Sequence, residues 1–238
     1  MRCHVRWGLI ALLAVTVSCG DDVVGPLLGD DGPITGPKAQ LRVVHTVLGL
    51  AALDVIVAGR VVLPSVAFGV PSAFVDVPAG SQPVAFRPAG TTATPQTSSI
   101  VFTVDDSVTV FTVDSSSIIN PWVLTDTGSV VPPDKSKLRV AHFAGNAPAV
   151  DIWRTQPDWQ QFITIMFPFR YQEASPYLQS DPGVWRVLVS SETRQGGIPL
   201  LGDTLLLSDP IDVPAGESRT VIVLDCAEGG LQAQVIRP

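Results

Sequence analysis

The sequence has few of the residues that usually carry catalysis or bind nucleic acid. It holds three histidines, three cysteines, and 15 Lys and Arg against 22 Asp and Glu, for a formal net charge of −7. That sign opposes binding driven by phosphate neutralisation, so we expect no nucleic-acid partner. The motifs His-Glu-x-x-His, Gly-x-Ser-x-Gly and Cys-x-x-Cys are absent, which makes a hydrolase a low-ranked alternative.

Long hydrophobic runs are also missing, because no apolar stretch reaches the roughly 20 residues of a membrane-spanning helix. The apolar residues 8–17 follow Arg2 and Arg6, a pattern typical of a secretory signal. Residues 16–19, "TVSC", resemble a bacterial lipobox, with threonine where leucine is usual. The resemblance implies cleavage after residue 18 and a diacylglyceryl thioether at Cys19, whose acyl chains anchor the protein in a membrane. The alternative is an ordinary cleaved signal with a chance cysteine.

Breaks in composition divide the chain. We expect a signal peptide at 1–18, a flexible tether rich in Gly, Asp and Pro at 19–39, and a proline-containing linker at 128–136. The folded domains are then residues 40–127 and 137–238. With Cys3 removed and Cys19 acylated, only Cys226 remains, so the sequence predicts no internal disulfide.

The rest of the chain has the pattern of β-strands. Residues 99–104 alternate in polarity, and β-branched runs occur at 108–113, 185–190 and 220–225. Turn sequences with Pro, Gly and Asp separate these runs at intervals of about 8–12 residues. The pattern predicts an all-β fold with no long helix.

A pentamer occurs twice, as "LRVVH" at 41–45 and "LRVAH" at 138–142, at an offset of 97 residues. The alignment continues with Phe68 opposite Tyr171, Phe74 opposite Tyr177, and Gly80 opposite Gly183 once six extra residues are allowed in the second copy. A repeat of this length, with about seven strands per copy, predicts two tandem immunoglobulin-like β-sandwich domains.

The motifs of both copies resemble a known family. "LRVVH", "LDVIVAGRVV" and "FGVPSAFVDVPAG" in the first copy, and "LRVAH", "APAVDIW" and "VLDCAEGG" in the second, are similar to the bacterial domain-of-unknown-function 4397 family. The resemblance implies exported, often tandem, β-sandwich domains. It implies no activity, and the middle of the second copy departs from the pattern.

The two repeated histidines are the first candidate site. His45 and His142 continue a core-facing row on their strands, and each precedes an aspartate, Asp54 or Asp151, by nine residues. We expect each imidazole to hydrogen-bond to that carboxylate or to backbone. One His and one Asp per domain fall short of the three or four ligands of a zinc site, so no metal is expected.

An enlarged aromatic hairpin at 151–171 is the second candidate site. It contains Trp153, Trp159 and Phe162, and it is six residues longer than its counterpart in the first copy. Aromatic side chains on a sandwich loop can stack on sugar or anchor a partner protein. The alternative is that these rings fill the second core or the space between the domains.

These features predict an exported, lipid-anchored bacterial envelope protein at the outer membrane or cell surface. We expect a non-enzymatic binding or structural module without a cofactor. Its candidate partners are the membrane through Cys19 and a cell-surface polysaccharide or envelope protein. A carbohydrate-recognition module that uses the aromatic hairpin is the alternative.

Overall fold

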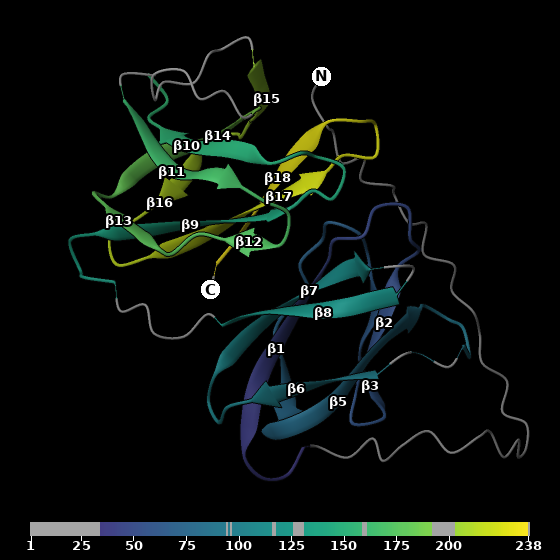
Figure 1. The fold of residues 1–238 in the computed structure, drawn as a ribbon. Helices are drawn as coiled ribbons and strands as arrows, with labels where there is room; N and C mark the ends of the chain where they lie inside the picture. Colours follow the sequence, from purple (N-terminus) through teal and green to yellow (C-terminus); the bar gives the residue numbers. More distant parts are fainter. Residues whose placement is uncertain are drawn as a thin grey trace, which may run out of the picture.

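The computed structural model describes residues 34–93, 95, 97–115, 118–125, 131–158, 161–191 and 203–237. The regular structure of these residues is almost entirely β-strand, which confirms the predicted all-β fold of tandem domains (Figure 1). The described part of the chain contains no helix with the length and apolar character needed to cross a bilayer.

The first domain is a sandwich of two four-stranded sheets, with strand orders β4-β1-β7-β8 and β3-β2-β5-β6. β1 pairs antiparallel with β4 and parallel with β7. Apolar side chains from both sheets fill the space between them. The strands are β1 Lys38–His45, β2 Leu53–Val57, β3 Arg60–Val66, β4 Val75–Pro78, β5 Gly80–Pro88, β6 Thr97–Phe102, β7 Ser107–Ser115 and β8 Ile118–Thr125.

The second domain repeats this plan with additional short strands. One sheet has the order β12-β9-β17-β18, with β13 also pairing β9, and the other has the order β11-β10-β14-β15, with β16 also pairing β14. β9 runs parallel to β17, as β1 does to β7. The strands are β9 Ser136–Phe143, β10 Val150–Thr155, β11 Phe162–Phe169, β12 Glu173–Ala174, β13 Leu178–Ser180, β14 Gly183–Ser191, β15 Thr204–Leu207, β16 Ile211–Val213, β17 Ser218–Asp225 and β18 Leu231–Ile236.

Equivalent contacts confirm the alignment of the two copies. The backbone N–H groups of Gly69 and Gln172 donate to the carbonyls of His45 and His142, each at 2.8 Å, so Phe68 and Tyr171 occupy the same place. β5 begins at Gly80 and β14 at Gly183, the two glycines that the sequence alignment places together. The six extra residues of the second copy therefore fall between Asp151 and Tyr171, as the sequence predicts.

The alternation of the repeated pentamer explains how the two sandwiches join. In β1, Leu41 and Val43 lie in the core of the first domain. Arg42 and Val44 point to the opposite face, because successive side chains of a strand alternate. Val44 is nevertheless fully buried, since that face is covered by the second domain.

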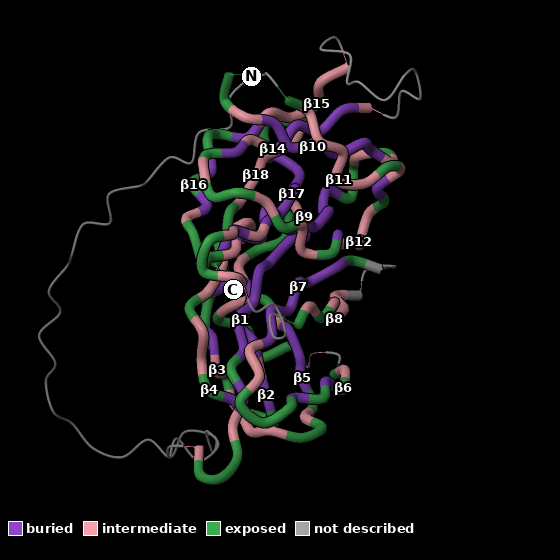
Figure 2. Tube along the Cα trace, turned by 90° about the vertical axis from the view of Figure 1, so that its left-hand side faces the viewer, coloured by how far each residue is buried: buried purple, intermediate pink, exposed green. Residues whose placement is uncertain are grey.

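A third apolar cluster, which we call the seam, joins the domains. The rings of Phe111 and Phe143 stack with centroids 4.2 Å apart and planes 12° apart, and Trp122 meets Phe143 edge-on at 5.1 Å. Figure 1 shows β7 and β8 facing β9 and β12 across this seam, and Figure 2 shows buried chain running through the same level of the molecule. The buried seam residues are Val44, Phe111, Val113, Ala141, Phe143, Ile222, Leu224 and Ile236.

Candidate functional sites

The repeated histidines are buried core residues. His45 and His142 are both 0% exposed. The Nδ1 atoms of His45 and His142 accept hydrogen bonds from the N–H groups of Val47 and Ala144, each at 3.3 Å. Burial lowers the pKa of both imidazoles, partly opposed by neighbouring backbone and, for His142, by carboxylates. Both side chains are therefore held as neutral structural groups.

The predicted imidazole–carboxylate pairs are wrong: each Nδ1 bonds to a backbone N–H, and Nδ1 of His45 also lies 3.0 Å from the Thr112 hydroxyl. The carboxylate of Asp54 accepts from the N–H of Ser65 at 3.1 Å and lies 3.5 Å from Nε of Arg87. Nε2 of each histidine has no hydrogen-bond partner. Alternation is the reason: Leu53 and Val55 face the core, so Asp54 faces away from it, and Asp151 does the same on β10 between Val150 and Ile152.

No metal site emerges among the residues described. That part of the chain has no group of three or more His, Cys, Asp or Glu side chains that could hold a metal ion.

The arginine of the repeated pentamer has a role that sequence reasoning missed. Arg42 donates to the hydroxyl of Thr109 in its own domain and to the carbonyl of Arg237 in the other. Arg139 donates to Thr220 at 3.0 Å and to the carbonyl of Thr125 at 3.2 Å. The two bonds across the seam are reciprocal, because each arginine reaches the end of the other domain's last strand. The signal was an arginine recurring at one register position of an apolar strand.

Aromatic rings cover both arginines. The Arg42 guanidinium lies 4.4 Å from the ring centroid of Phe74, and the Arg139 guanidinium lies 4.2 Å from that of Tyr177. Phe74 and Tyr177 are the pair that the sequence alignment matched. Each arginine thus forms a cation–π contact within its own domain and a hydrogen bond to the other domain, which fixes the orientation of the two sandwiches.

A small polar cavity of about 250 Å³ opens at one end of the seam. Asp114 from the first domain and Asp225 from the second line it, together with Tyr171 and Asn146. The carboxylate of Asp225 accepts a hydrogen bond from the N–H of Asn146 at 3.3 Å. Burial raises the pKa of the Tyr171 phenol, and the two carboxylates add to the shift. Its phenol therefore stays protonated and can donate.

The aromatic rings of the hairpin at 151–171 differ in how far they are exposed. Trp153 is 4% exposed and its indole N–H donates to the Ser190 hydroxyl at 3.3 Å, so its prediction as a binding surface is wrong. The ring lies beside Leu188 and Ser190 of β14, on the face of the sheet opposite to the core residue Ile152. Phe162 is half-buried on β11, and Trp159 lies outside the described residues. The exposed ring on β11 is Phe167, at 64%.

A second polar cavity, of about 260 Å³, lies beside the loop that joins β10 to β11 in this hairpin, and we call it the hairpin cavity. Arg154 and Gln156 line it from β10 and just beyond, and Gln161 lines it just before β11. Trp185 lines the other side, with the Arg154 guanidinium 4.8 Å from its ring centroid. The sequence did not point to this place, because one arginine within the strand sequence of β10 is a weak signal.

The cysteines differ from the sequence prediction. Cys19 lies outside the described residues. Cys226 is buried directly after β17 and is disulfide-bonded, so the expectation of no internal disulfide is wrong. The bond was missed because Cys3 and Cys19 were both assigned to removal or acylation.

The comparison with protein families supports the resemblance seen in the sequence. Residues 39–153 match the model of a family described as a domain of unknown function, DUF4397. This segment contains all the strands of the first domain from Ala39 onward, and β9 and part of β10 of the second. A search of curated proteins found no match.

Proposed function

We propose that this protein is an exported, lipid-anchored bacterial envelope protein that acts as a non-enzymatic binding module. The anchor would be Cys19, at the end of the signal-like segment with Arg2 and Arg6 before its apolar run. The 18 residues between Cys19 and the start of β1 at Lys38 would hold the sandwiches away from the membrane.

The hairpin cavity is the observation that carries the binding role. It is a concave polar site on the second sandwich, and at the equivalent of Arg154 the first sandwich has the core residue Val57, which is 1% exposed. The histidines, by contrast, are buried in the two cores and line neither of the two cavities described here.

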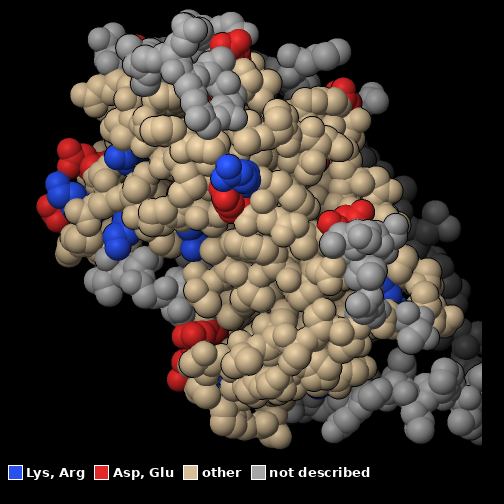
Figure 3. Space-filling view, in the orientation of Figure 1, with Lys and Arg blue, Asp and Glu red and all other residues tan. Residues whose placement is uncertain are grey.

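Contacts at the seam support the view that the two domains act as one rigid binding unit. Its stacked rings and reciprocal arginine bonds tie the two domains together, so a ligand bound at the second domain would be presented at a fixed orientation to the first. The face shown in Figure 3 carries Lys, Arg, Asp and Glu in small mixed groups separated by uncharged surface. Recognition would therefore depend on local sites.

Membrane fractionation tests the anchor. We expect wild type in the membrane fraction and Cys19→Ala in the soluble fraction, with Cys226→Ala as the matched cysteine control that stays with the membrane. Intact mass adds a second criterion, because one sulfur cannot hold both a thioether and a disulfide. A lipid adduct at Cys19 supports the proposal, whereas a Cys19–Cys226 disulfide in the mature protein, or a membrane-bound Cys19→Ala variant, contradicts it.

Carbohydrate recognition is the specific form of binding that the hairpin cavity favours. Amide groups from Gln156 and Gln161 and the Ser180 hydroxyl line it, and such groups can donate to and accept from sugar hydroxyls. The sequence placed this function on the aromatic tip around Trp159. We now propose the polar residues that flank the same tip, Gln156 and Gln161.

A further inference from the structure

The guanidinium of Arg154 is buried, and two of its nitrogens have no hydrogen-bond partner. The residue is 6% exposed, and neither Nε nor Nη1 makes a hydrogen bond. Burial lowers its pKa, yet an arginine keeps its charge at any physiological pH. A buried charge without hydrogen bonds is costly, so the structure holds a cation with unused donors at the wall of a cavity.

The first domain shows that the fold does not require this arginine. Val57 occupies the position equivalent to Arg154, because Val57 pairs with Val84 on β5 and Arg154 pairs with Val187 on β14. Two residues before these strand partners lie Gln82 and Trp185, which are therefore equivalent as well. Val57 packs in the first core, and the amide of Gln82 donates to the carbonyl of Ala79 at 3.0 Å. At this end of its core, the second domain has an arginine and a tryptophan beside a cavity, where the first domain has a packed valine and a hydrogen-bonded glutamine.

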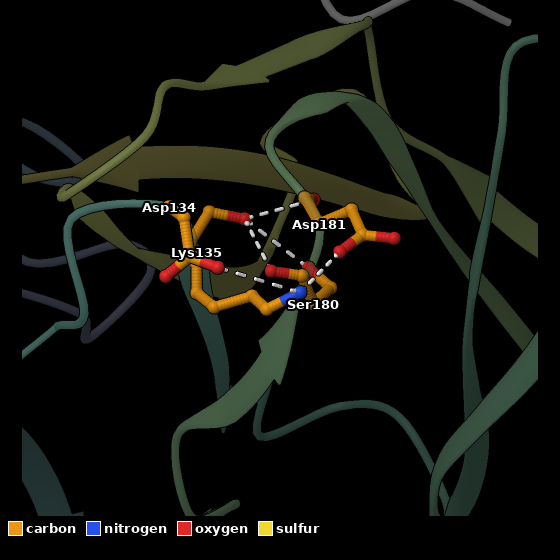
Figure 4. A network of polar contacts seen from close by, with 5 residues as sticks. Asp134, Lys135, Ser180 and Asp181 are labelled. Atoms are coloured by element: carbon orange, nitrogen blue, oxygen red, sulfur yellow. Dashed lines mark hydrogen bonds and ion pairs between the residues drawn. The ribbon is translucent and has the colours of Figure 1, made fainter.

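The cavity has one unbalanced charge. Among the described residues, its charged lining residues are Arg154 and Asp181. Figure 4 shows Asp181 turned to Lys135, whose Nζ lies 2.7 Å from its carboxylate and 3.9 Å from that of Asp134. The hydrogen bond from Lys135 lowers the pKa of Asp181, which keeps that carboxylate ionised and paired. Arg154 is left as the uncompensated charge.

We propose that the hairpin cavity binds the carboxylate of an acidic sugar, a uronate unit, through the guanidinium of Arg154. A guanidinium fork matches a carboxylate with two parallel hydrogen bonds. The indole N–H of Trp185, also buried and without a partner, is a further donor at the same wall.

Size and lining favour one sugar ring over a larger ligand. Drug-sized ligands occupy roughly 300–1,000 Å³, whereas this cavity measures about 260 Å³. Gln156, Gln161 and Ser180 supply amides and a hydroxyl for the ring hydroxyls. The inference rests on the proposed binding function and names its ligand class, but it is independent of lipid attachment at Cys19.

Calorimetric titration of the full chain in detergent at low salt tests the proposal with sodium glucuronate, glucose and sodium acetate. We expect glucuronate to bind, and glucose and acetate to bind at least tenfold more weakly. Arg154→Met should weaken glucuronate binding at least tenfold, and Arg170→Met, which removes an exposed arginine of the same domain, should leave it unchanged.

Thermal unfolding separates lost binding from lost folding. Because Arg154→Met removes an unpaired buried charge and keeps a long apolar side chain over Trp185, it should raise the unfolding temperature by about 2 °C or more. Equal binding of glucose or acetate, no glucuronate binding, or full binding by Arg154→Met would each overturn the proposal. None of these outcomes changes the result of the anchoring test at Cys19, so a failure of uronate binding can be told apart from a failure of lipid attachment.

Discussion

Removal of the Phe143 ring should uncouple the two sandwiches. Phe143 is fully buried in the seam, stacked on Phe111 at 4.2 Å and edge-on to Trp122 at 5.1 Å. Phe143→Ala should lower the free energy of unfolding by about 3–5 kcal/mol, the usual cost of deleting a buried ring. The pair with Phe111 should contribute about 0.5–1.5 kcal/mol of this as a coupling between domains.

A double-mutant cycle measures that coupling. Urea unfolding of wild type, Phe111→Ala, Phe143→Ala and the double variant would be followed by tryptophan fluorescence, to which Trp122 beside the pair contributes. Wild type should unfold in one transition, and Phe143→Ala should separate the two domains into distinct transitions.

The matched control is Phe102→Ala, which removes an equally buried ring from the first core, away from the seam. Phe102→Ala should lower the free energy of unfolding of the first domain by a similar amount. The effects of Phe102→Ala and Phe143→Ala should add, because the two rings are not in contact. Additivity of Phe111→Ala and Phe143→Ala within about 0.3 kcal/mol, or separate transitions in wild type, would refute the fixed seam.

Two further predictions concern the repeated pentamer. Arg42→Met and Arg139→Met should each cost about 1.5–3 kcal/mol in urea unfolding, because each removes one charge-assisted bond across the seam, and a loss from only one variant would contradict the reciprocal arrangement. Since burial depresses the pKa of His45 and His142 below the ordinary 6.5, the unfolded chain binds more protons, and stability should fall as pH drops below about 6.5. Replacing both histidines by Asn should reduce that pH dependence between pH 7.5 and 5, and an unchanged slope would contradict their titration.

The architecture could be predicted because each copy repeats the same local constraints. Alternating apolar residues define the strands, and Gly80 and Gly183 mark the same strand start in both copies. The partners of His45 could not be found from spacing, since Asp54, nine residues later, lies on a different sheet and on its outer face. Spacing along the chain does not show which sheet or face a side chain joins.

The candidate site shows the same limit. The enlarged hairpin was visible as six extra residues, and a cavity lies beside its loop. The sequence favoured the aromatic residues Trp153 and Trp159, because rings are common at binding surfaces. Trp153 is buried beside Ser190, and the neighbouring Arg154 lines the cavity instead. Whether a charge is paired depends on tertiary packing, which pattern alone does not contain.

A crystal structure with sodium glucuronate tests the binding function most directly. We predict the carboxylate of the sugar within hydrogen-bond distance of the Arg154 guanidinium, with the ring beside Gln156 and Gln161. Glucuronate bound elsewhere with the hairpin cavity empty, or an Arg154 guanidinium paired with a carboxylate of the protein itself, would contradict it.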